Sequence, residues 1–87
     1  MDRYVFTLDA ERDLDRLDSQ IRQRILKRLK WLAENAESIR HEPLSGPLGA
    51  LYKFRIGDYR VLYDRIEREQ ILLIHQVDHR SKVYRAK

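Results

Sequence analysis

The sequence contains no cysteine, only three glycines, two prolines and one tryptophan among its 87 residues. Without cysteine the chain can form no disulfide bond, iron–sulfur cluster or thiolate zinc site, so we expect it to work in the reducing cytoplasm. No apolar run approaches the roughly 18 residues that cross a membrane, and residues 1–10 carry acidic side chains and no long apolar stretch. We therefore expect neither membrane insertion nor secretion.

The length of the chain predicts one small domain, residues 1–87. Such a chain buries only about 60% of its unfolded surface, so its large apolar residues are needed in one compact core. We therefore expect no buried cofactor and no small-molecule cofactor.

The positive charge lies in the second half of the sequence. The formal net charge is +4, and residues 1–43 contribute nothing to it because their nine basic and nine acidic side chains cancel. Residues 44–87 carry nine basic and five acidic side chains. This half is where we expect an anionic partner to bind.

The first half reads as a strand and two helices. Residues 4–6 are rich in β-formers and predict a short strand. Apolar residues then recur at helical spacing over residues 10–21 and again over 21–36, which predicts two amphipathic helices in an αα-hairpin. The residues placed to cap them are Thr7 or Asp9 and Asp18 or Ser19.

Residues 37–50 have no periodicity and contain Pro43, Gly46, Pro47 and Gly49, so we interpret them as a loop. Three strand-like segments follow, at 51–56, 59–66 and 71–77. We predict an α+β fold: a short N-terminal strand, an αα-hairpin and a three-strand antiparallel meander.

A two-residue turn at Gly57 and Asp58 would pair Arg55 with Arg60. One face of the hairpin is then apolar and suited to the helices: Tyr52, Phe54, Ile56, Tyr59, Val61 and Tyr63. The other face carries Lys53, Arg55 and Arg60. Opposed like charges cost an amount comparable to the roughly 0.2–1 kcal/mol of a good cross-strand pair, so we expect this face to bind an anion.

The last strand returns antiparallel, which brings Arg80 beside the same turn together with His79 and Tyr84. Four cations on one surface favour an anion site. The alternative is a solvated basic face, neutralised by acids such as Asp58, Asp64 and Asp78.

Other chemistries lack their residues. His41, His75 and His79 show no metal-ligand spacing, Ser45 has no triad context, and no glycine-rich phosphate loop precedes a helix. We therefore expect no metal site, and interpret His75 as an ordinary sheet residue.

Trp31 falls on the far side of the second predicted helix, beside Arg24, Lys27 and Arg28. Either Trp31 packs sideways against a loop beside a solvated face, or this surface docks a protein or RNA partner.

Two segments, LYKFRIGDYRVLY at 51–63 and VDHRSKVYR at 77–85, closely resemble the RelE branch of the RelE/ParE toxin superfamily. The order of elements and PLSG at 43–46 extend the resemblance over the whole chain. It implies a toxin of a bacterial type II toxin–antitoxin pair that cleaves mRNA in the ribosomal A site and so inhibits translation. It implies no metal, a 2′-hydroxyl nucleophile, and products with a cyclic phosphate and a 5′-hydroxyl.

The family's functional positions correspond to Lys53, Arg55, Arg60, Arg80 and Tyr84. Arg60 and Arg80 suit phosphate binding because a guanidinium stays charged and grips two oxygens. The RelE pattern has lysine where this chain has Arg55, which cannot cycle a proton, and His79 replaces a further lysine. The general base is then Lys53, Tyr84 or His79, and we favour Tyr84 supported by Lys53; Tyr84 can also stack on a base.

The resemblance also implies partners: an antitoxin protein, the ribosome and mRNA. We expect Trp31 to anchor the antitoxin. The basic residues expected to contact RNA or the ribosome are Arg24, Lys27, Arg28, Lys82 and Arg85. The alternatives are a ParE-like inhibitor of DNA gyrase without nuclease activity, and a non-catalytic RNA-binding module, which would need aromatic residues interleaved with the cations.

Overall fold

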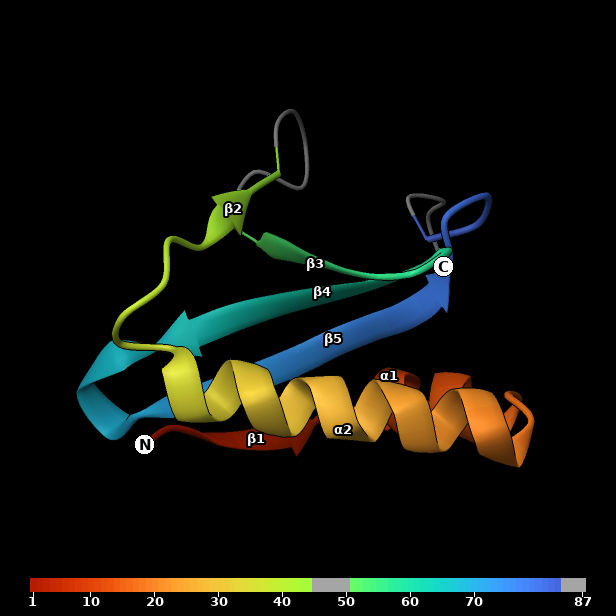
Figure 1. Ribbon diagram of the computed structural model, residues 1–87, viewed down its shortest axis with the longest axis horizontal. Helices are drawn as coiled ribbons and strands as arrows, with labels where there is room; N and C mark the ends of the chain where they lie inside the picture. The colour runs from red at the N-terminus through yellow and green to blue at the C-terminus, as the bar shows by residue number, and fades with distance from the viewer. Residues whose placement is uncertain (45–50, 84–87) are drawn as a thin grey trace.

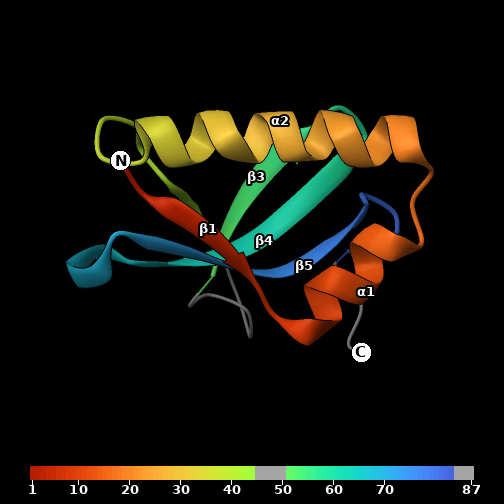
Figure 2. The same cartoon turned by 90° about the horizontal axis from the view of Figure 1, so that it is seen from below.

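The computed structural model describes residues 1–44 and 51–83, which form a five-stranded sheet with two α-helices on one face (Figure 1; Figure 2). In chain order the elements are β1 (Arg3–Phe6), α1 (Leu8–Asp15), α2 (Ser19–Asn35), β2 (Glu42–Pro43), β3 (Tyr52–Ile56), β4 (Tyr59–Ile66), a 3₁₀ turn (Glu67–Glu69) and β5 (Ile71–His79). The strand order is β1-β5-β4-β3-β2. The α+β class is confirmed, and the predicted meander forms the centre of the sheet.

Side-chain caps fix where both helices begin. The Thr7 hydroxyl accepts from the Ala10 N–H at 3.2 Å, and the Asp18 carboxylate accepts from the N–H groups of Gln20 and Ile21 at 2.9 and 3.1 Å. These bonds satisfy backbone donors that have no partner inside a helix. The prediction that the first helix reaches residue 21 was wrong, because α1 ends at Asp15 and α2 takes over the later apolar residues.

The hairpin of β3 and β4 has the predicted register, with Arg55 opposite Arg60 and Ile56 opposite Tyr59. Gly57 occupies the turn with a left-handed φ of 58°. Beyond the hairpin the sheet is larger than predicted: β1 pairs in parallel with β5, and β5 continues to His79 rather than ending at Val77.

The prediction of a loop over residues 37–50 needs a correction. Glu42 and Pro43 form the strand β2, which pairs antiparallel with Lys53 and Tyr52 of β3. A strand of two residues has no alternation, so hydrophobic periodicity cannot reveal it. Residues 45–50 lie outside the described residues.

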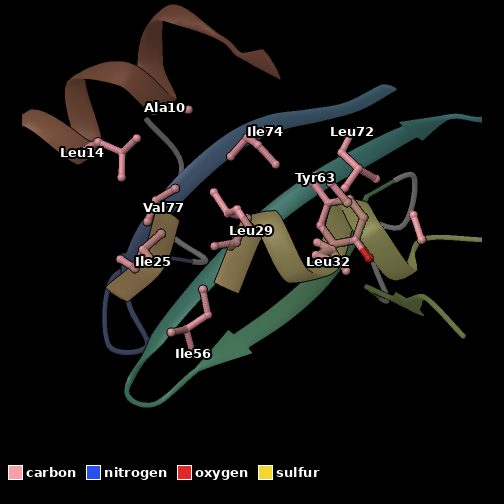
Figure 3. Packing of buried hydrophobic residues seen from close by; sticks show 13 residues of the cluster. Ala10, Leu14, Ile25, Leu29, Leu32, Ile56, Tyr63, Leu72, Ile74 and Val77 are labelled. Carbon is pink, nitrogen blue, oxygen red and sulfur yellow. The ribbon is translucent and has the colours of Figure 1, made fainter. Parts of the chain in front are cut away.

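The core lies between the helices and the sheet, as Figure 3 shows. Its fully buried side chains include Ile25, Leu29 and Leu32 from α2, and Val61, Tyr63, Leu72, Ile74 and Val77 from the sheet. Burial of each large apolar side chain stabilises the fold by about 1.5–3 kcal/mol. A bulge between Leu62 and Tyr63 shifts the pairing of β4 with β5, so His75 lies opposite no residue of β4.

A buried ion pair ties the N-terminal strand to the sheet. The fully buried Asp2 carboxylate accepts from Arg65 Nε at 2.9 Å, and the Asp2 N–H donates to the Ala33 carbonyl at 3.0 Å. The hydrogen bond with Asp2 raises the pKa of Arg65 above its already high usual value. Removing either partner would leave a buried charge without compensation.

We expect Gly57→Ala to lower the free energy of unfolding by about 1–2 kcal/mol, because an L-residue pays that much in the left-handed region. The Arg24 guanidinium also occupies the space that a Cβ at this position needs. Urea denaturation measures the change. The matched variant Gly57→Asn should cost less, since asparagine tolerates this conformation; equal losses in both would show that crowding, not backbone strain, dominates.

Candidate anion-binding site

The hairpin places three cationic side chains on the sheet face that carries no helix. The strand register puts Lys53 opposite Leu62 and Arg55 opposite Arg60, so all three cations alternate away from the helix-covered face. Arg60 lies opposite Asp78 of β5. We call Lys53, Arg55, Arg60 and the adjoining Arg80 the cationic face.

Arg60 and Arg80 converge on the Gly57–Asp58 turn. Arg60 Nη1 donates to the carbonyls of Gly57 and Tyr59 at 2.8 and 2.9 Å. The Arg80 N–H donates to the Asp58 carbonyl at 2.7 Å, and Arg80 Nε lies 3.9 Å from the Asp58 carboxylate. The predicted position of Arg80 beside the turn is confirmed.

Lys53 and Arg55 share one carboxylate, that of Glu42. Glu42 Oε1 lies 3.4 Å from Lys53 Nζ and 3.7 Å from Arg55 Nη2. The Lys53 side chain is 19% exposed, whereas those of Arg55 and Glu42 are 61% and 52% exposed. Ion pairs as exposed as that of Arg55 contribute at most about 1 kcal/mol, so a phosphate can compete for these cations.

The sequence reasoning did not single out Glu42. It considered Asp58, Asp64 and Asp78 as neutralising acids, and of these three only Asp58 forms an ion pair with the cationic face. Asp64 and Asp78 instead accept from the next backbone N–H, that of Arg65 or His79, at 2.8 Å. The one available signal was Pro43, because the residue before a proline favours an extended backbone.

His79 does not join the cationic face. It pairs with Tyr59, which packs against the core, and their rings meet edge to face with centroids 5.6 Å apart. His79 Nδ1 lies 2.9 Å from the Ser81 hydroxyl. Our prediction that His79 lies with Arg55 and Arg60 was wrong, since β5 continues through residue 79 and alternation turns this side chain to the helix side.

Of the remaining predicted contact residues, Lys82 lies in the exposed turn after β5. Tyr84 and Arg85 lie outside the described residues.

Trp31 packs against a strand rather than a loop. Its ring is parallel to that of Phe54, with an interplanar angle of 5° and centroids 6.2 Å apart, and it remains 38% exposed. The Arg28 guanidinium lies over both rings, 4.8 and 5.4 Å from their centroids. A groove of about 330 Å³ runs from Trp31 and Arg28 to Glu42, Lys53 and Arg55, and we call it the α2–β3 groove.

The other predicted contact residues of α2 divide between two surfaces. Arg24 reaches the Gly57 turn. With Lys27 and Lys30, Arg24 also lines a shallow hollow of about 670 Å³ beside Tyr4. Two of the three predicted cations, Arg24 and Arg28, thus adjoin the hairpin.

The described ranges 1–44 and 51–83 contain no group of three or more His, Asp or Glu side chains that could hold a metal ion. They also contain no helix long and apolar enough to span a membrane. The ion pairs of the cationic face, in contrast, bring positioned cations and a carboxylate together.

A model of the ParE toxin family of type II toxin–antitoxin systems (parDE) matches residues 4–84 of the chain. The chain belongs to this toxin family. It is thus a toxin of a type II system within the RelE/ParE superfamily. No relative was found among curated proteins by sequence.

Solved structures of related toxins have the same fold. A chain of the RelBE2 toxin–antitoxin complex from Mycobacterium tuberculosis is 28% identical, with a TM-score of 0.79 over 88% of this chain and 95% of that chain. The isolated RelE toxin of E. coli is 19% identical, with a TM-score of 0.75 over 100% and 89%. A YoeB/ParE toxin from Agrobacterium tumefaciens is 20% identical, with a TM-score of 0.71 over 88% and 96%.

We expect Glu42→Gln to strengthen binding of a polyanion to the cationic face by about fivefold, because each opposed charge at this distance is worth about 1 kcal/mol even in high dielectric. The probe is a short single-stranded DNA, which has no 2′-hydroxyl, titrated by fluorescence anisotropy at low salt. Glu69→Gln, in the 3₁₀ turn, makes the same charge change elsewhere. An equal gain in both variants would mean that only net charge matters.

Proposed function

We propose that this toxin is an endoribonuclease that cleaves mRNA in the ribosomal A site and so inhibits translation. The observation that carries the proposal is the like-charged pair Arg55 and Arg60, set opposite each other on the hairpin and flanked by Lys53 and Arg80. A fold keeps such an arrangement when an anion compensates for it. The 28% identity with a chain of the RelBE2 complex supports the comparison with RelE-type toxins.

In the proposed reaction the 2′-hydroxyl of the RNA attacks the adjacent phosphorus. The new bond joins O2′ to phosphorus, and the bond from phosphorus to O5′ breaks. O5′ takes up a proton, which balances the one lost from O2′, and the products carry a 2′,3′-cyclic phosphate and a 5′-hydroxyl. Negative charge builds on the phosphate oxygens in the transition state, where fixed cations stabilise it most. Arg60 and Arg80 at the turn can each grip two of these oxygens, while Arg55 adds charge.

The proton of the 2′-hydroxyl needs an acceptor. We assign this role to Tyr84, supported by the charge of Lys53, because both match functional positions of the resembled family. His79 is less suited, since it lies on the helix side of the sheet with its Nδ1 bonded to Ser81. The Glu42 carboxylate, 3.4 Å from Lys53, is a competing acceptor that the sequence did not suggest.

The alternative is a ParE-like inhibitor of DNA gyrase, which the ParE family match favours. Four residues argue against this alternative, because they have the residue types found at RelE functional positions: Lys53, Arg60, Arg80 and Tyr84. A non-catalytic RNA-binding module fits less well, because Trp31 is the one exposed aromatic side chain among the described residues, whereas Tyr59 and Tyr63 pack into the core.

We expect Arg60→Ala and Arg80→Ala each to slow cleavage by about 100-fold or more, as loss of a charge-stabilising donor does, without unfolding the protein. Single-turnover primer extension on ribosome-programmed mRNA measures the rate. Arg68→Ala, an exposed arginine in the 3₁₀ turn, is the matched control and should cleave as the wild type does. His79→Ala should stay within about threefold of the wild-type rate, far less than the loss of a general base costs.

Wild-type cleavage by folded Arg60→Ala and Arg80→Ala variants would refute the assignment of the cationic face. If the wild-type toxin leaves the mRNA intact but blocks DNA supercoiling by purified gyrase, the ParE-like alternative holds instead.

The partner that we propose for the inactive state is a cognate antitoxin. The solved relatives include RelB–RelE antitoxin–toxin complexes, among them one from Methanococcus jannaschii. The α2–β3 groove offers such a partner an exposed aromatic ring, Trp31, beside the cations Arg28, Lys53 and Arg55. An acidic segment with one large apolar residue matches this surface, and by filling it would cover part of the cationic face.

We expect Trp31→Ala to weaken the affinity for the cognate antitoxin by about 30-fold or more, the loss typical of a central interface aromatic. Isothermal titration calorimetry measures the affinity. Leu8→Ala removes an exposed apolar side chain from the start of α1 and should change it by less than about threefold. Unchanged affinity in Trp31→Ala would place the anchor elsewhere.

A further inference from the structure

His41 connects three parts of the fold that are distant in sequence. Its Nε2 lies 2.8 Å from the Ala36 carbonyl at the end of α2, and its Nδ1 is hydrogen-bonded to the hydroxyl of Tyr63 in β4. Its ring also packs against those of Tyr52 and Tyr63, with centroids 5.4 and 5.7 Å away. Such a set of directed contacts is more than the packing of a loop residue requires.

The two hydrogen bonds define the form of the imidazole. A carbonyl oxygen only accepts, so the proton lies on Nε2, and Nδ1 is then free to accept from the Tyr63 hydroxyl. Burial, followed by the nearby Tyr52, raises the pKa of Tyr63 well above its usual value, so this phenol keeps its proton and remains a donor. A ring with its proton on Nε2 thus satisfies both neighbours.

The residue that follows His41 is Glu42, the counterion of Lys53 and Arg55. Strand β2 contains only Glu42 and Pro43, and proline has no N–H to donate to β3. Backbone pairing therefore holds this strand by few hydrogen bonds, and next to it the Leu44 N–H donates to the Leu51 carbonyl at 2.9 Å. The side chain of His41 provides a second attachment, directly beside the carboxylate that faces the cations.

We infer that His41 is a positioning residue, which fastens β2 to α2 and β4 and thereby holds the Glu42 carboxylate against Lys53 and Arg55. This inference deepens the proposed function, because the cations concerned are those assigned to RNA cleavage. His41 itself is hydrogen-bonded to Ala36 and Tyr63, and its effect on the cations passes through Glu42.

The first test does not depend on cleavage. Trace acylation of lysine amines, quantified by peptide mass spectrometry, reports how far the Glu42 carboxylate shields the Lys53 amine from the reagent. Lys27 of α2 in the same molecule is the internal standard. We expect Lys53 in His41→Phe to react about threefold or more faster relative to Lys27, the factor that corresponds to loss of an ion pair of this kind.

Phenylalanine keeps the ring packing of residue 41 and removes both hydrogen bonds. Tyr63→Phe removes one of them and should give a smaller acceleration. His41→Gln restores a donor and an acceptor and should return the Lys53 reactivity to within about twofold of the wild type. The control His75→Phe changes a histidine at the β5 bulge and should have no effect on Lys53.

A double-mutant cycle shows whether His41 acts through Glu42. Glu42→Gln alone should accelerate Lys53 acylation, and adding His41→Phe to it should give no further increase. Independent, multiplicative effects, or unchanged Lys53 reactivity in folded His41→Phe, would overturn the inference.

The second test measures cleavage. In His41→Phe we expect the single-turnover rate at saturating ribosomes to fall about tenfold, because Lys53 and Arg55 lose the carboxylate that holds their geometry. If the wild type does not cleave, the proposed function fails, and the acylation result still decides the role of His41. A wild-type rate in His41→Phe despite faster Lys53 acylation would overturn its link to the reaction.

Discussion

The two-residue turn at Gly57 and Asp58 is the constraint on which the rest of the structure depends. Its left-handed glycine fixes the register of β3 and β4, and the period of two along a strand then assigns every side chain to one face. A slip of β3 by one residue against β4 would send Lys53 and Arg55 into the helix-covered core while Arg60 stayed outside it. One backbone conformation thus determines which hairpin side chains enter the core and which form the cationic face.

Two kinds of ion pair serve different purposes in this fold. The pair of Asp2 and Arg65 is withdrawn from water and joins the N-terminal strand to β4, so it belongs to the permanent structure. The contacts of Glu42 and Asp58 with the cationic face are longer and more exposed. Such contacts lower the self-repulsion of the cationic face at little cost, and a phosphate anion can replace them.

The sequence was sufficient where short-range rules determine the structure. The helix caps Thr7 and Asp18, the hairpin turn and the two faces of the hairpin all follow from residue type and spacing. It failed where the outcome depends on partners distant in sequence. Nothing local indicates that β1 pairs with β5, that a two-residue strand brings Glu42 to Lys53, or that Trp31 stacks on Phe54. His79 was misplaced because β5 runs two residues further than predicted. Alternation then puts His79 on the same side of the sheet as Val77, which faces the core.

The parallel pairing of β1 with β5 has a consequence for the timing of synthesis. β1 leaves the ribosome first, but it pairs with β5, the last strand to be synthesised. Phe6, for example, pairs with Ile74. β5 is also the strand between β1 and β4, and it leads to Arg80 at the turn. A nascent chain that ends before β5 therefore lacks the strand that joins β1 to β4, and it lacks Arg80 of the cationic face. The topology therefore delays completion of the toxin's fold until translation of its own message has passed this strand.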